Sequence, residues 1–118
     1  RATIEAVAYQ TFDLFEAMKH DGLRPKIVKV DGGMVMNNWF SQFLSDIVNV
    51  KVLRPKVQET TALGAAFMAG LQIGVYKSLK DISKNWHLDK KFSPKMKNKS
   101  RSTLIKGWEK AVKRALIN

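Results

Sequence analysis

The chain has no cysteine among its 118 residues and only two histidines, His20 and His87. The lack of cysteine excludes disulfides, thiolate catalysis and cysteine-ligated zinc, and it agrees with a reducing compartment, so we expect a cytoplasmic protein. The two histidines lie too far apart in sequence to form a local metal-binding signature. We therefore expect no metal site.

Long apolar runs are missing as well. No stretch approaches the roughly 20 consecutive apolar residues that cross a bilayer, so we expect no membrane partner. With 45% hydrophobic residues, the chain can build one small domain with its own core, but not two. It starts at Arg1, inside an expected helix and without an initiator Met, which predicts a piece of a longer protein.

The formal net charge of +11 is unevenly distributed. Residues 1–76 carry 8 basic against 7 acidic side chains, whereas residues 77–118 carry 13 against 3. Such a block is typical of a surface that binds nucleic acid, and more often of a solvated tail. Aromatic residues would favour a grip on nucleic acid, yet residues 95–106 contain none. A basic nucleic-acid-binding module is therefore the less favoured interpretation.

The chain is organised around residues 27–38. A β-branched run that favours a buried strand ends in Asp31-Gly32-Gly33, where two glycines allow positive φ and leave no Cβ between the backbone and a ligand. Helical spacing follows at once, with Asn37 or Asn38 placed to cap the first turn. A strand, glycine turn and helix N-terminus can hold a nucleotide or anion, although such a turn is often only structural and this one matches no standard phosphate-binding motif.

Hydrophobic periodicity predicts an α/β fold in which two short parallel strands flank a crossover helix. The expected elements are a helix over 1–19, a strand over 26–31, a helix over 38–48, a strand over 50–54, a helix over 60–73 and, in the basic tail, a helix over 102–117. A short helix within 79–86 and a loop over 89–102 complete the prediction. The helix over 60–73 is apolar on nearly every side, so we expect it to be buried, and Trp108 is expected to anchor the core.

Three ordered motifs and the end of the chain resemble one family. They are Arg1–Thr11, the stretch from Val30-Asp31-Gly32-Gly33 through Asn37-Asn38, Thr60–Ala66 and the closing Gly107–Ala115. Together they resemble the C-terminal end of the FGGY carbohydrate kinases, most of all those that act on glycerol. The resemblance covers essentially the whole chain. It implies part of a ribonuclease H-like domain of the actin and hexokinase type of ATPase, with short parallel strands and flanking helices.

The resemblance also implies an activity, namely transfer of the γ-phosphoryl group of ATP to glycerol, giving sn-glycerol 3-phosphate, with Mg²⁺ bridging the phosphates. In the family, the glycine and asparagine of the Asp-Gly-Gly…Asn motif line the adenosine side of the nucleotide pocket. Carried over, these nucleotide-binding residues are Gly33 and Asn37, with Gly32 as a neighbour. Asp31 is interpreted as serving the turn. No catalytic residue is assigned, because the family's catalytic aspartate, glycerol-binding residues and phosphate loops lie upstream of these motifs.

Further expectations concern assembly and alternatives. The strand before the Asp-Gly-Gly turn would lack its usual partner, so we expect an open sheet edge that favours self-association, and an isolated chain that is inactive. We expect a homo-oligomeric full enzyme that binds ATP or ADP, with glycerol held by the missing N-terminal part.

In some relatives an acidic stretch docks a regulatory protein, and the basic residues 95–102 make that docking doubtful here. Another FGGY kinase, such as one for a pentulose, remains the alternative.

Overall fold

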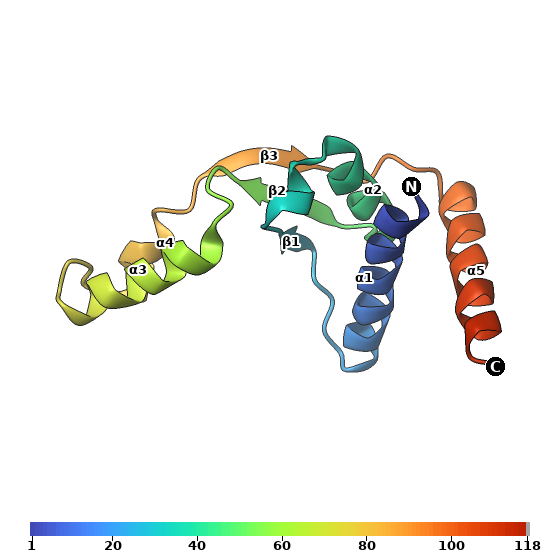
Figure 1. The fold of residues 1–118 in the computed structure, drawn as a ribbon, viewed down its shortest axis with the longest axis horizontal. Helices are drawn as coiled ribbons and strands as arrows, with labels where there is room; N and C mark the ends of the chain where they lie inside the picture. Colours follow the sequence, from blue (N-terminus) through green and yellow to red (C-terminus); the bar gives the residue numbers. More distant parts are fainter. Residues whose placement is uncertain (118) are drawn as a thin grey trace.

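A three-stranded sheet lies at the centre of the chain, with helices on either side of it (Figure 1). The computed structural model describes residues 1–117. In chain order its elements are α1 (Ala2–His20), β1 (Ile27–Lys29), the 3₁₀ helix η1 (Gly33–Met36), α2 (Asn38–Val48), β2 (Lys51–Pro55), α3 (Thr60–Gln72), α4 (Leu79–Ser83), β3 (Leu88–Phe92) and α5 (Asn98–Ala115). The sheet order is β1-β2-β3, with β1 parallel to β2 and β3 antiparallel to it. The predicted α/β class and the parallel pair flanking a helix are confirmed.

The C-terminal ends of α1 and α2 fall within one residue of their predicted positions. Gly22, after α1, and Asn49, after α2, both have positive φ, of 83° and 57°. Glycine and asparagine are the residues that adopt this conformation most readily, so each ends its helix without strain. Strand bounds differ more. β1 is shorter than the expected 26–31, because only its residues 27–29 pair in register with β2.

The predicted loop over 89–102 is wrong. Its first part belongs to β3, which pairs with β2, and α5 begins at Asn98 rather than at residue 102. The strand was missed because Asp89, Lys90 and Lys91 are residue types that strands disfavour on average. β3 is nevertheless an edge strand of the described sheet, exposed apart from Phe92, and charged side chains are typical of such edges.

The core lies where α1, α2 and the sheet meet. Its buried hydrophobic residues are Ala8, Tyr9, Phe15, Val35, Phe40, Phe43, Leu44, Ile47, Val48, Val52 and Phe92. Tyr9 meets the Phe43 ring edge-on at 5.7 Å between centroids and stacks on Trp108 of α5 at 5.5 Å. Trp108 also donates a hydrogen bond from Nε1 to Asp13 Oδ2, at 2.7 Å. Trp108 therefore anchors α5 to the core, as expected. Burial of Tyr9 in the same cluster raises the pKa of its phenol.

The expected burial of α3 is contradicted. Gly70 is the one α3 residue that is fully buried, and Figure 1 shows α3 and α4 projecting away from α1, α2 and α5. Phe67 packs edge-on against Tyr76, so this arm has a small apolar contact of its own. The radius of gyration is 17.3 Å, against about 13 Å for a compact domain of this length. The apolar sequence of α3 is thus left without a described element to cover it.

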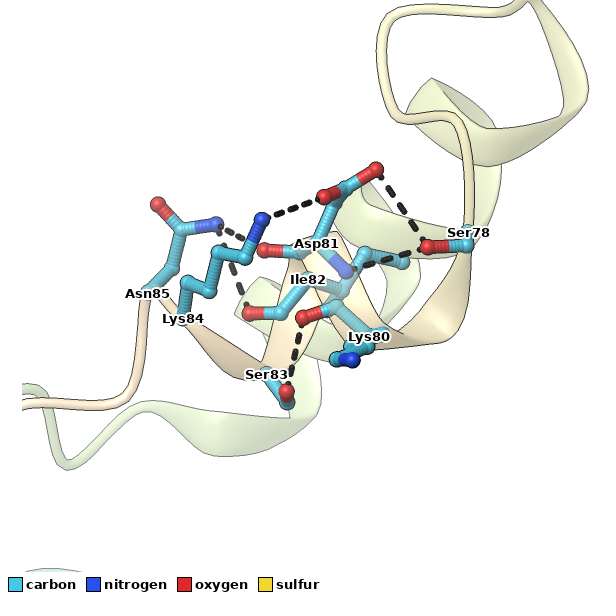
Figure 2. Close-up of polar contacts among 7 residues, drawn as sticks. All are labelled: Ser78, Lys80, Asp81, Ile82, Ser83, Lys84 and Asn85. Atoms are coloured by element: carbon cyan, nitrogen blue, oxygen red, sulfur yellow. Dashed lines mark hydrogen bonds and ion pairs between the residues drawn. The ribbon is translucent and has the colours of Figure 1, made fainter.

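Local polar contacts hold α4 (Figure 2). Ser78 caps the helix by accepting the Asp81 N–H at 3.2 Å, and Asp81 pairs with Lys84 at 2.8 Å. Asn85 donates to the carbonyls of Asp81 and Ile82. All these partners lie within eight residues of one another. The shape of α4 therefore depends on its own segment more than on the core.

Asp46 on α2 fastens the segment that joins β3 to α5. Its Oδ1 accepts the backbone N–H groups of Lys95, at 2.5 Å, and Met96, at 3.0 Å. Gln42, one turn earlier on α2, donates from Nε2 to the Ser93 carbonyl at 2.9 Å. Asp46 is only 9% exposed, and charge-assisted hydrogen bonds of this kind are strong. α2 thereby sets where α5 begins.

Replacing this carboxylate should loosen α5. We expect Asp46→Ala to lower the free energy of unfolding by about 2 kcal/mol, because two partly buried backbone N–H groups lose their charged acceptor. Asp81→Ala is the matched control, since its partner Lys84 is largely exposed and such pairs contribute only about 0–1 kcal/mol. Urea denaturation followed by circular dichroism measures both values. Equal losses in the two variants would show that Asp46 does not hold the segment.

Candidate functional site

The turn between β1 and α2 has the backbone freedom that a ligand site requires. Gly32 has φ 86° and ψ 171°, a region that essentially only glycine occupies. Gly33 begins η1 without a positive φ, so only one of the two predicted glycines uses this freedom. A Cβ built on either glycine would meet nothing within 4 Å. The space beside both glycines is open to an approaching group.

Asn37, one of the two residues predicted as the cap, caps α2. Its Oδ1 accepts the backbone N–H groups of Trp39, at 3.0 Å, and Phe40, at 3.3 Å. The cap engages the side-chain oxygen, so the amide nitrogen is the group better placed to donate to a ligand. Asn38 is the first helical residue, and Trp39 stacks on Phe43 with 5.0 Å between ring centroids. The helix N-terminus with its partial positive charge thus lies directly behind the glycine turn.

Arg54 of β2 holds the turn in place, and the sequence analysis did not identify it. Its Nη1 donates to the carbonyls of Val35, at 2.8 Å, and Met36, at 3.2 Å. Its Nε donates to Asp89 Oδ2 at 2.7 Å. The alternation of side chains along β2 could have indicated this role. Side chains two residues apart share a face of a strand, so Arg54 lies on the same buried face as Val52. An arginine on a buried strand face requires nearby acceptors.

Asp31 connects the turn to α3. The Thr60 hydroxyl, at the first residue of α3, donates to Asp31 Oδ2. The carboxylate thus bonds a side chain of another element and contributes to the structure around the turn. The two ends of the contact lie just beyond β1 and β2, so it couples the glycine turn to the projecting arm.

Two cavities open at the carboxyl ends of β1 and β2, of about 160 and 380 Å³. Lys29, Pro55, Thr60 and Trp86 border both of them. The carboxyl edge of parallel strands is where open α/β sheets bind ligands. Neither lining includes Gly32, Gly33 or Asn37. The three predicted residues therefore lie together on the open turn beside this edge, outside the two cavities.

Residues 1–117 hold neither a candidate metal cluster nor a candidate membrane span. Within that range no three or more His, Asp or Glu side chains come together as a possible metal site. Nor does any helix there have the length and apolar character to cross a membrane.

Comparison with known sequences identifies close relatives. Residues 1–73 match the model of the FGGY family of carbohydrate kinases, C-terminal domain. The chain is 53% identical over 113 residues to glycerol kinase 1 of Pseudomonas aeruginosa and 55% identical over 117 residues to the glycerol kinase of Thermoanaerobacter pseudethanolicus. These alignments cover 96% and 98% of the chain but 23% and 24% of the relatives. The chain thus spans about a quarter of the length of the curated relatives it matches.

Solved structures of two kinases superpose on the chain. A crystal structure of Plasmodium falciparum glycerol kinase with ADP superposes with a TM-score of 0.82 at 38% identity, covering 100% of this chain and 24% of that one. Xylulose kinase of Lactobacillus acidophilus gives 0.79 over 99% of this chain and 24% of that one, with 24% identity, and so shows the fold alone. The predicted actin and hexokinase type of ATPase fold is confirmed. Because the family model matches more than half of the chain, the chain belongs to the FGGY family of carbohydrate kinases.

Proposed function

We propose that the chain is the nucleotide-binding part of a kinase that transfers the γ-phosphoryl group of ATP to glycerol, giving sn-glycerol 3-phosphate. One observation carries the proposal: an open glycine turn leads into a capped helix N-terminus in a chain 55% identical to a glycerol kinase over 117 residues. Glycerol is favoured over a pentulose because the xylulose kinase match has only 24% identity. The substrate-binding half lies outside this chain.

We assign the adenosine side of the nucleotide pocket to Gly33 and Asn37, with Gly32 beside them. The open space at both glycines allows the base or ribose to approach the backbone closely. The Asn37 amide nitrogen is available to donate to an acceptor on the base or ribose. Phosphoryl transfer depends mainly on positioning and electrostatic stabilisation. The turn's contribution is to position the nucleotide.

Mg²⁺ is assigned to the nucleotide phosphates rather than to this chain. The acidic and histidine side chains of residues 1–117 form no cluster of three that could hold it. When bound, the ion would neutralise charge that develops on the phosphates. The residues of this chain act on the nucleoside end instead.

A nucleic-acid-binding module is less well supported. Trp108, the aromatic residue within the basic terminal helix, stacks on Tyr9 and donates to Asp13. Its ring is therefore engaged with α1 and does not offer a platform for stacking bases. The positive charge of the segment remains a property of its solvated face.

Titration with nucleotide should locate the pocket. We expect Mg·ADP to shift the amide resonances of Gly32, Gly33, Asn37 and the first turn of α2, because those groups would contact the nucleoside. A short DNA duplex at physiological salt should leave the spectrum unchanged. Two-dimensional ¹H–¹⁵N NMR measures both responses. Shifts confined to residues 95–114 on adding duplex would instead support the nucleic-acid module.

The two glycines should respond differently to alanine. Gly33→Ala should leave stability nearly unchanged, since Gly33 has no positive φ and room for a Cβ, yet weaken Mg·ADP binding about tenfold, or ~1.4 kcal/mol, by blocking close approach. Gly32→Ala should lower the free energy of unfolding by about 1–3 kcal/mol, because only glycine occupies its backbone conformation readily. Urea denaturation and NMR titration separate these effects. Unchanged affinity in Gly33→Ala would contradict the assignment.

Without the remaining three quarters of its relatives' length, the chain should not phosphorylate glycerol in a coupled assay.

The chain should also self-associate at concentrations on the order of tens of micromolar, because β1 is an edge strand and α3 leaves apolar side chains exposed. Ile27→Lys, on exposed β1, should weaken the association, whereas Leu116→Lys, exposed beyond α5, should not. Sedimentation velocity measures both. A wild-type monomer would contradict the expectation. For the whole enzyme, the cytoplasmic, homo-oligomeric assignment stays a prediction from sequence.

A further inference from the structure

We propose that Arg54 is a positioning residue for the nucleotide: from beneath the glycine turn it fixes the backbone that the nucleotide meets. The inference rests on the proposed nucleotide site and deepens it. Arg54 lies on β2, and its contacts reach η1 rather than the open face of the turn. It therefore acts through the turn and does not touch the nucleotide.

The guanidinium joins three segments of the chain. Nη1 bridges two consecutive carbonyls of η1, and Nε pairs with Asp89 on β3. The guanidinium carbon also lies 5.6 Å from the centre of the Phe92 ring, at the end of β3. Arg54 is only 6% exposed, whereas the side chain of Asp89 is 39% exposed. A buried cation is tolerated only when its donors are satisfied, so the arginine and the turn constrain each other.

The geometry of the turn explains why this hold matters. A four-residue 3₁₀ helix has few internal bonds, and the glycine before it adds conformational freedom. Each peptide unit is planar, so directing the Met36 carbonyl toward Arg54 also sets the direction of the Asn37 N–H. That N–H donates to the Met34 carbonyl at 3.2 Å, which closes the turn. Asn37, whose side chain caps α2, extends from the end of this same peptide unit.

A second hydrogen bond, from Ser41 of α2, also holds the turn. The Val35 carbonyl accepts both from Arg54 Nη1 and from the Ser41 hydroxyl, each at 2.8 Å. A carbonyl oxygen has two lone pairs, so this acceptor is fully used from β2 on one side and α2 on the other. The turn is therefore ordered before any ligand arrives. A ligand that meets an ordered loop avoids the entropy loss of ordering it, which raises affinity.

Lysine cannot replace arginine in this role. Both carry a positive charge, but the planar guanidinium presents donors in a fixed fork, while an ammonium is a single point on a flexible stem. Arg54→Lys therefore keeps the positive charge but removes the fixed spacing by which Nη1 holds the η1 carbonyls while Nε holds Asp89. The variant separates a positioning role from a purely electrostatic one.

The test uses the 118-residue chain in three forms: wild type, Arg54→Lys and the control Arg24→Lys, which changes an exposed arginine. In Arg54→Lys we expect the carbonyl ¹³C shifts of Val35 and Met36 to change and the Asn37 amide to exchange with solvent about tenfold faster. If the ordered turn is then populated about one-tenth of the time, the Kd for Mg·ADP rises about tenfold. Resonances of α1 and α5 should stay in place, which a general loss of structure would not allow.

A second variant keeps the test decisive if Arg54→Lys fails to fold. Asp89→Asn retains the guanidinium and removes only its charged partner, so exchange at Asn37 should accelerate by a smaller factor, about twofold to threefold. Unchanged exchange at Asn37 in the folded variants, or a change of the same size in Arg24→Lys, would overturn the proposal. If Mg·ADP does not shift the amide resonances of Gly32, Gly33 and Asn37 in the wild type, the proposed function fails. The exchange rates of the Asn37 amide still decide whether Arg54 orders the turn.

Discussion

The pairing of β2 on both of its edges is the constraint on which the rest of the structure depends. β1 adds to it in parallel and β3 in antiparallel register, so every strand of the described sheet is placed by β2. Its alternation sends Val52 into the core, fully buried, and Arg54 toward the turn on the same face. A five-residue strand thus sets both the packing of α2 and the shape of the candidate site. A slip of one residue would exchange these two side chains for exposed Lys51 and half-buried Leu53.

Local chemistry predicted much of this arrangement. The glycine turn, the cap at Asn37 and the end of α2 at Val48 depend on residues within a few positions of one another, and all three lie at positions that the sequence predicted. Features that depend on distant partners were missed. β3 consists largely of charged residues and exists because β2 offers an edge, and the beginning of α5 depends on Asp46, 49 residues before Lys95. Arg54 belongs to this second group, since its acceptors lie in η1 and β3.

For α3 the sequence predicted a feature, burial of the helix, that the structure does not show. Its apolar pattern predicts burial, and the described chain places no layer over it, so the pattern is correct about the residue types and wrong about this chain's contacts. The chain spans about a quarter of the length of its curated relatives, and within residues 1–117 the apolar side chains of α3 have little cover. The contact between Thr60 and Asp31 then gains importance, because it ties this uncovered arm to the glycine turn.

The placement of the three tryptophans has a spectroscopic consequence. Trp39 stacks on Phe43 next to the cap, Trp86 borders the cavities beside α3 with the Lys29 amine 4.0 Å from its ring centre, and Trp108 lies between α1 and α5. Each indole thus samples a different neighbourhood, with a different polarity and a different set of quenching groups. Variants that retain one tryptophan at a time would turn intrinsic fluorescence into three separate reporters, for the turn, the projecting arm and the docking of the terminal helix. The chain carries its own site-resolved labels.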